Sequence, residues 1–144
     1  DHYCYHFAPK ELDKGSGIAH PLNKKLKGKW RRTMVDFCVF PNHLVTLMPD
    51  YLWWVSVMPN GVGLFDATWG VAVPQEILND IAEVDYERWV KDKIDYMNTA
   101  NEEDRVLVER LFQGSQSIRV PQGTYHPIEK NLWQFMQYLS KITV

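Results

Sequence analysis

The middle of the chain alternates short apolar segments with turn-forming residues, and this pattern constrains the fold more than any other feature. Each segment is rich in β-branched and aromatic side chains, which is typical of strands. Because the segments are short and their connections tight, neighbouring strands are predicted to pair antiparallel. The pattern continues to residue 73, so we predict a meander of three or four strands. The clearest segments are residues 33–40, 43–48 and 51–58, closed by Pro41-Asn42, Pro49-Asp50 and Pro59-Asn60-Gly61.

After Pro74 the apolar residues recur every three or four positions, which predicts a helix that runs to about Thr99. A second helix is predicted to begin at Asn101, which would serve as its N-cap. Acidic residues at 102–104 would load the first turn of that helix with the charge that the helix dipole favours, and Gly114 would end it.

A last amphipathic helix is predicted from about Pro127 to Ile142. Residues 10–33 are polar and rich in Lys and Gly, which predicts a loop or flap. The order of elements is therefore that of an α+β protein. A length of 144 residues with 45% hydrophobic residues suits a single domain over residues 1–144.

Charge and hydropathy exclude several classes of partner. The formal net charge of −2 gives no electrostatic reason to expect nucleic acid or an anionic membrane surface. No apolar stretch approaches the roughly 18 residues of a membrane span, and no secretion signal opens the chain. Two cysteines do not make a disulfide framework. We therefore expect a cytoplasmic protein.

The first residues offer a possible metal site. Cys4-Tyr5-His6 has the Cys-x-His form of half a Rieske motif, but the second half, starting at Cys38, would need a histidine where Pro41 stands. A cluster within this chain is therefore excluded. His2, Cys4 and His6 also alternate, so on a strand they would share one face. That face could hold a soft metal ion or be an ordinary aromatic strand.

Asp104 is the carboxylate that most needs explaining. It lies one turn before Val108, whose helix stripe continues through Leu111 and Phe112, so Asp104 is expected on or near a buried face. A carboxylate there needs a partner. From the residues alone, a capping or salt-bridging role and a metal-binding role both remain open.

A string of residues around Asp104 carries a family resemblance, and further matching segments extend it over residues 15–140. The most specific positions are Asp104, Glu109, Gln113, Gly114 and Ser117. The other matching segments are Phe40-Pro41-Asn42-His43-Leu44, Pro49-Asp50-Tyr51, Pro121-Gln122-Gly123, Tyr125-His126-Pro127-Ile128-Glu129 and Phe135. Together they resemble the C-terminal part of the catalytic domain of Rieske-type non-haem iron oxygenase α subunits.

The resemblance implies a helix-grip fold, in which a curved antiparallel sheet closes around a long C-terminal helix. It also implies mononuclear Fe(II) held by two histidines and one carboxylate, the carboxylate being Asp104. The family's His-x4-His pair and its Rieske domain have no match here, and His20, His43 and His126 are isolated. We therefore expect an incomplete, distal part of the catalytic domain, which is not active alone.

For the intact protein the resemblance implies O2-dependent hydroxylation or demethylation of a small aromatic or quaternary-amine substrate. Electrons would come from a reductase or ferredoxin through a [2Fe-2S] Rieske cluster in the missing N-terminal part, and a homotrimer is expected. The residues predicted to line the substrate pocket are His43, Val45, Trp53, Val55, Ile94 and Met97. Strand register decides which of them point inward.

Two other functions stay open at this point. The helix-grip fold also serves non-enzymatic modules that bind lipids or small molecules in an apolar cavity. The chain could also be an assembly fragment that packs on other subunits. A carboxylate facing the interior at Asp104 would favour the oxygenase over the cavity carrier.

Overall fold

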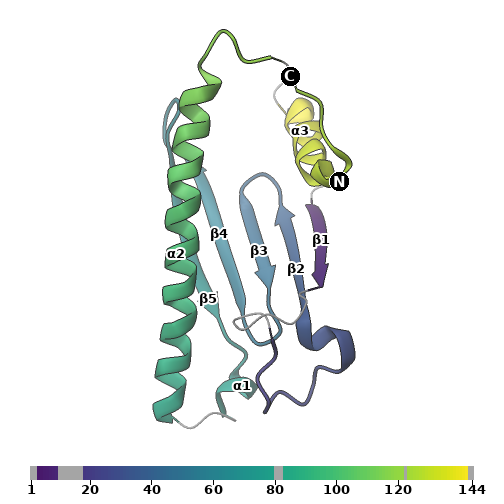
Figure 1. Ribbon diagram of the computed structural model, residues 1–144, viewed down its shortest axis with the longest axis vertical. Coiled ribbons are helices and arrows are strands. Elements are labelled where there is room, and N and C mark those ends of the chain that lie inside the picture. The colour runs from purple at the N-terminus through teal and green to yellow at the C-terminus, as the bar shows by residue number, and fades with distance from the viewer. Residues whose placement is uncertain (1–2, 10–17, 80–82, 122, 143–144) are drawn as a thin grey trace. The chain divides into compact units, whose positions relative to one another are not determined.

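The computed structural model describes residues 3–9, 18–79, 83–121 and 123–142, and for residues 3–9 it describes the backbone (Figure 1). Its contacts divide the chain into two compact units. One unit holds residues 1–82 and 125–144, and the other holds residues 83–124. Each unit is described by itself below.

The first unit contains a five-stranded sheet in which every strand pairs antiparallel with its neighbour in sequence (Figure 1). The predicted meander over residues 33–73 is confirmed, with strand ends close to the predicted turns. A further strand at the start of the chain pairs with the second strand across a long connection, and no local sequence pattern predicts that pairing. The strands are β1 (Tyr3–Pro9), β2 (Thr33–Val39), β3 (His43–Leu47), β4 (Leu52–Pro59) and β5 (Phe65–Ala72).

The register of β4 places its two adjacent tryptophans on opposite faces of the sheet. Residues that lie directly opposite each other in antiparallel strands point to the same face. Trp54 lies opposite Val45 on β3 and opposite Gly70 on β5. Trp53 lies opposite Thr46 on β3. The sheet therefore has a Trp54 face and a Trp53 face, and we use these names below.

Hydrogen bonds link the segment before β2 to the turn between β3 and β4. Asp50 is 4% exposed, and its carboxylate accepts hydrogen bonds from the backbone N–H of His20 and from Asn23 Nδ2 (2.7 Å). Arg31 donates to four backbone carbonyls of the same segment, among them Ala19 O (3.1 Å). In the segment expected to be a loop, residues 18–27 form no helix or strand and Gly28–Arg32 form a 3-10 helix, while residues 10–17 lie outside the described residues.

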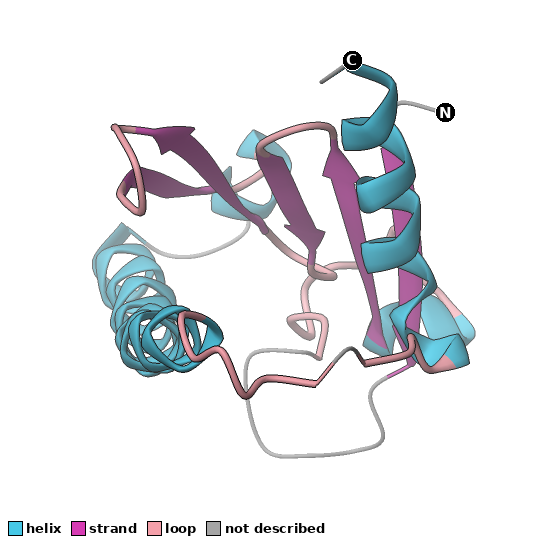
Figure 2. Cartoon of the chain, turned by 90° about the horizontal axis from the view of Figure 1, so that it is seen from above, coloured by secondary structure: helices cyan, strands magenta, loops and turns pink. Residues whose placement is uncertain are grey.

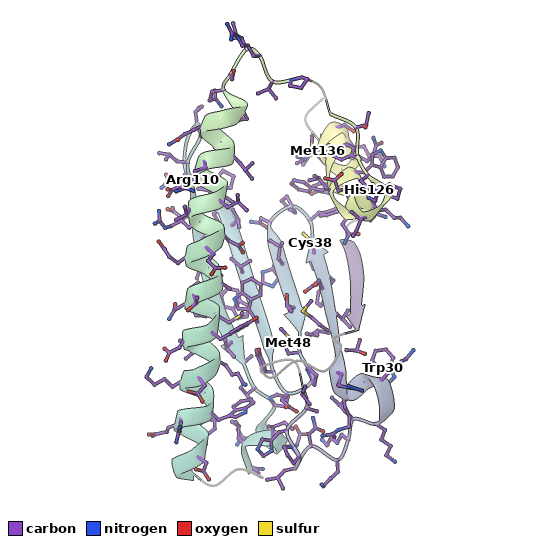
Figure 3. All side chains as sticks on the ribbon, in the orientation of Figure 1. Trp30, Cys38, Met48, Arg110, His126 and Met136 are labelled. Carbon is purple, nitrogen blue, oxygen red and sulfur yellow. The ribbon has the colours of Figure 1, made fainter. Side chains whose placement is uncertain are left out.

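The C-terminal helix confirms the prediction that a helix follows Pro127. A short 3-10 turn, Pro127–Glu129, leads into α3 (Lys130–Ile142). A capping box precedes the turn at His126, which is labelled in Figure 3. His126 Nδ1 accepts from Ile128 N (3.3 Å), and Glu129 Oε2 accepts from His126 N (2.6 Å). These reciprocal bonds satisfy backbone donors that the turn would otherwise leave unpaired.

Helix α3 lies next to β1, at one edge of the sheet (Figure 2). Phe40, from the turn between β2 and β3, is 8% exposed and places its ring 5.4 Å from that of Phe135 and 5.3 Å from that of Tyr138. Burial of these aromatic rings joins the helix to the sheet. The first unit is therefore an antiparallel sheet with a packed helix, which agrees with the α+β class.

The prediction that a separate helix begins at Asn101 is wrong. After the short α1 (Gln75–Asn79), α2 runs without a break from Glu83 to Ser115. The sequence between Glu83 and Gln113 holds no Gly or Pro, so nothing stops the helix before residue 101. The acidic residues that looked like a first turn are accommodated in mid-helix by Arg105, which bonds Glu102 and Glu109.

Among the described residues, no helix is both long and apolar enough to span a bilayer.

Candidate functional site

Helix α2 carries Asp104 on the face that the apolar periodicity predicted. Ile94, Met97, Asn101 and Asp104 follow one another at spacings of three, four and three, so they lie along one side of the helix. Met97 is 4% exposed. Asp104 itself is exposed, in contrast to the expectation that it would be buried.

Arg105 forms ion pairs with Glu102 and Glu109, which lie before and after Asp104 in the sequence, and not with Asp104. Its Nε and Nη2 donate to the two carboxylate oxygens of Glu102, at 2.9 and 2.6 Å, and its Nη1 donates to Glu109 Oε1 at 2.6 Å. The hydrogen bond from Arg105 lowers the pKa of Glu102, and the bonds to Glu102 and Glu109 raise the pKa of Arg105.

The carboxylate of Asp104 makes no hydrogen bond or ion pair within the described part of the chain. Asp104 also lies well inside α2, so it does not cap a helix. In the described structure Asp104 therefore neither caps a helix nor forms a salt bridge, the two structural roles that the sequence left open. The carboxylate is left available to a ligand.

Each of the three described histidines uses its Nδ1 in a local contact. His20 Nδ1 accepts from Leu22 N (3.3 Å), and His126 Nδ1 serves the capping box. His43 Nδ1 is 2.7 Å from Ser56 Oγ. Within the described residues there is no group of three or more His, Cys, Asp or Glu side chains that could hold a metal ion.

The described side chains therefore fit one position of a two-histidine, one-carboxylate iron site and do not complete it. The hypothesis of a soft-metal site at the start of the chain falls outside the described residues, since the side chains of His2, Cys4 and His6 are not among them. Register alone places Cys4 opposite Cys38 and His6 opposite Asp36.

The residues predicted to line a substrate pocket are divided by the structure. His43 and Val45 are on the Trp54 face, and Trp53 and Val55 are on the other face. Strand register thus divides the strand candidates into two sets on opposite faces of the sheet. Ile94 and Met97 share the α2 face of Asp104 in the second unit. The part that each plays in substrate binding stays a prediction.

The Trp54 face is closely packed around its tryptophan. The Trp54 indole lies directly over Gly70, where a Cβ atom would come within 2.9 Å of Trp54 Nε1. The His43 ring stacks on the Trp54 ring with centroids 5.9 Å apart, while its Nδ1 contacts Ser56. These contacts hold the imidazole and the indole in fixed positions.

The Trp53 face carries polar groups that sequence reasoning missed. Thr46, 9% exposed, donates from Oγ1 to Asp36 Oδ1 at 2.6 Å. Trp53 Nε1 is buried and meets no acceptor among the described residues. The signal that could have revealed Asp36 is its place as the one charged residue in an otherwise apolar strand sequence, Thr33–Val39.

Comparison with known protein families tests the resemblance seen in the sequence. A family model described as the ring hydroxylating alpha subunit (catalytic domain) matches residues 10–143, nearly the whole chain. The chain belongs to this family. The resemblance seen in the sequence is thus confirmed, and the ring-hydroxylating domain is an oxygenase catalytic domain that works with substrate, O2 and electron-transfer partners. A comparison with curated proteins gave no match.

Proposed function

We propose that this chain is the distal part of a ring-hydroxylating oxygenase catalytic domain and that Asp104 supplies the carboxylate ligand of its mononuclear iron. The proposal rests on the place of Asp104 in the family motif and on its unpaired carboxylate. The residue stands in the string Asp104, Glu109, Gln113, Gly114 and Ser117, inside the family match, and its carboxylate is unpaired among the described residues. Its neighbours Glu102 and Glu109 are both paired with Arg105.

Iron held by two histidines and one carboxylate leaves positions open for O2 and suits oxygen-dependent hydroxylation or demethylation. The contribution of this chain is a carboxylate fixed on a rigid helix, one turn or less from Asn101 and two turns from Met97. The two histidines would come from outside the described side chains.

The wider assembly is part of the same proposal. The sheet and α3 would form part of a helix-grip domain, with α3 as the gripped helix. A [2Fe-2S] Rieske cluster would deliver electrons from a reductase or ferredoxin, and the active assembly would be a homotrimer. The substrate would be a small aromatic or quaternary-amine compound.

The test uses the chain with imidazole supplied in place of the absent histidines. Co(II) is titrated anaerobically into the chain at a fixed imidazole concentration, and binding is followed by visible absorption. Asp104→Ala removes the proposed ligand. Glu103→Ala is the matched control, because Glu103 is also exposed on α2 and also lacks a described ion pair.

We expect the wild-type chain and Glu103→Ala to bind Co(II) equally, and Asp104→Ala to bind at least about tenfold more weakly, as loss of a ligand interaction commonly produces. Equal binding by all three proteins would remove Asp104 from the metal site. Failure of the wild-type chain to bind Co(II) above the level of Asp104→Ala would overturn the proposal in the same way.

A further inference from the structure

Two cysteines occupy facing positions on the first pair of strands in the sheet unit. The backbone register of β1 and β2 places Cys4 directly opposite Cys38. Spacing along the chain could not pair these residues, because a long connection separates the two strands. The juxtaposition is a property of the sheet and follows from the backbone positions of residues 3–9 and 33–39.

Directly opposite positions in antiparallel strands are close enough for a disulfide bond. Their Cα atoms lie about 5.5 Å apart where the two residues exchange backbone hydrogen bonds and about 4.5 Å apart where they do not. Disulfides join residues whose Cα atoms are about 4.4–6.8 Å apart. Both kinds of pair fall within this range, so the backbones of β1 and β2 can stay in place when Cys4 and Cys38 are joined.

The register also places the two cysteines on the same face of the sheet. A slip of one residue would bring Tyr3 or Tyr5 opposite Cys38 and would move Cys4 to the other face. A bond between the two cysteines therefore depends on the described register, and its formation reports that register.

The face that carries Cys38 is open to small molecules in water. Cys38 itself is half-buried. The residue opposite Cys38 on β3 is Leu44, which is 42% exposed. A small oxidant can therefore approach Cys38 without a pocket in the sheet unit.

We propose that Cys4 and Cys38 form a reversible disulfide, which makes this strand pair a redox-sensitive site. The oxidant is a low-molecular-weight disulfide such as glutathione disulfide. One cysteine thiolate attacks it and releases one glutathione, and the second thiolate then displaces the other glutathione from the mixed disulfide. The S–S bond of glutathione disulfide breaks, an S–S bond forms between the cysteines, and two electrons and two protons pass to two molecules of glutathione.

The bond links an edge strand to the sheet. In the described sheet β1 pairs with β2 alone, and α3 lies next to β1. A strand that is paired on one side only belongs to the segments that open at a low cost in free energy. A covalent link to β2 restricts the opened and unfolded chain more than the folded chain. Oxidation therefore stabilises the edge of the sheet unit beside α3.

The experiment measures bridge formation in the folded and in the unfolded chain. The wild-type chain is equilibrated in glutathione buffers of graded redox potential, with and without denaturing urea, and is then quenched in acid. Intact mass spectrometry measures the fraction of chains that have lost two hydrogen atoms, and peptide mapping identifies the joined peptides. Cys4→Ser and Cys38→Ser each keep one thiol and show the mass of a glutathione adduct alone.

A register control moves one thiol by a single position along β1. The double variant Cys4→Ser with Tyr5→Cys keeps two thiols, as in the wild-type chain. Tyr5 lies opposite Phe37, so the new cysteine occupies the face opposite to that of Cys38. The control therefore matches the wild-type chain in the number of thiols and differs in the face on which one of them is placed.

We expect the equilibrium constant for the bridge in the wild-type chain to be at least about tenfold greater without urea than in urea, because the folded sheet already holds the two positions together. The register control should show no such preference for the folded chain. The oxidised wild-type chain should also unfold at a higher urea concentration than the reduced chain, and added reductant should reverse this shift.

An equal bridge constant in the folded and unfolded wild-type chain would overturn the proposal. So would a folded-state preference of the same size in the register control, or bridges that form only between two chains, which non-reducing gel electrophoresis detects. If the register control fails to fold, the comparison of folded with unfolded wild-type chain still decides. The readout contains no metal, so its outcome is independent of the role of Asp104.

Discussion

The sheet unit and helix α2 position their side chains by different means. In the sheet unit the contacts join distant parts of the sequence, such as Phe40 with Phe135 and Asp36 with Thr46. In α2 the described ion pairs join residues three or four positions apart, such as Glu102 with Arg105. The Thr46–Asp36 hydrogen bond on the Trp53 face therefore forms only when β2 and β3 hold one register, whereas the position of Asp104 depends only on its helix.

This difference predicts how each region responds to substitution. A change that disturbs the packing between strands should lower the free energy of unfolding of the whole sheet unit, because neighbouring strands share one register. A change on the exposed surface of α2 should remain local and should be screened by salt.

The largest effect is expected for Gly70→Ala. The new Cβ would lie 2.9 Å from Trp54 Nε1 and 3.0 Å from two ring carbons, and the ring is held by His43. We expect the free energy of unfolding in urea to fall by about 3 kcal/mol, the upper end of the range for overpacking. The helical control Gly114→Ala meets nothing within 4 Å and should gain up to about 1 kcal/mol. Equal effects of the two substitutions would contradict the claim that the sheet unit is more sensitive than α2 to added side-chain volume.

A smaller loss is expected for Asp50→Ala. The substitution removes the carboxylate that accepts from the backbone N–H of His20, and it leaves the buried Asn23 Nδ2 with the Pro49 carbonyl (3.3 Å) in place of the shorter bond to Asp50. The free energy of unfolding should fall by about 2 kcal/mol, which urea denaturation measures. Asp66→Ala, at an exposed carboxylate with one hydrogen bond to Asn60, should change it by less than about 0.5 kcal/mol. A loss at Asp66 as large as that at Asp50 would show that burial is not the cause.

The smallest effect is expected on α2 itself. Arg105 lowers the pKa of the Glu102 carboxyl, so the ion pair stabilises the helix above the unfolded value of about 4.3 and is lost as pH falls through the lower, folded value. Carbon-detected NMR titration should show the pKa of Glu102 below its ordinary value, and Arg105→Gln should raise it back towards that value. A Glu102 pKa that Arg105→Gln leaves unchanged would contradict the pairing of Glu102 with Arg105.

The sequence predicted those parts of the fold that local signals control. The strands between residues 33 and 58 were found because Pro and Asn mark their ends, and the last helix because Pro127 precedes an apolar stripe. The pairing of β1 with β2 could not be found, because a long connection separates them. The start predicted at Asn101 failed because acidic residues favour a first turn and a mid-helix pair with Arg105 equally well.

The candidate site shows the same limit. Helical spacing placed Asp104 with Met97 on one face, but only the family motif pointed from that face to iron. Register separated His43 from Trp53 and brought Asp36 beside Thr46, and no local pattern fixes register to a single residue.

The central claim is that Asp104 is the iron-binding carboxylate of an oxygenase catalytic domain. Its most direct test is anaerobic equilibrium dialysis against Fe(II) and imidazole, with iron measured by elemental analysis. The account predicts that wild-type chain and Glu103→Ala retain the same amount of iron and that Asp104→Ala retains at least about tenfold less at subsaturating Fe(II). Equal iron in Asp104→Ala and the wild-type chain would contradict it.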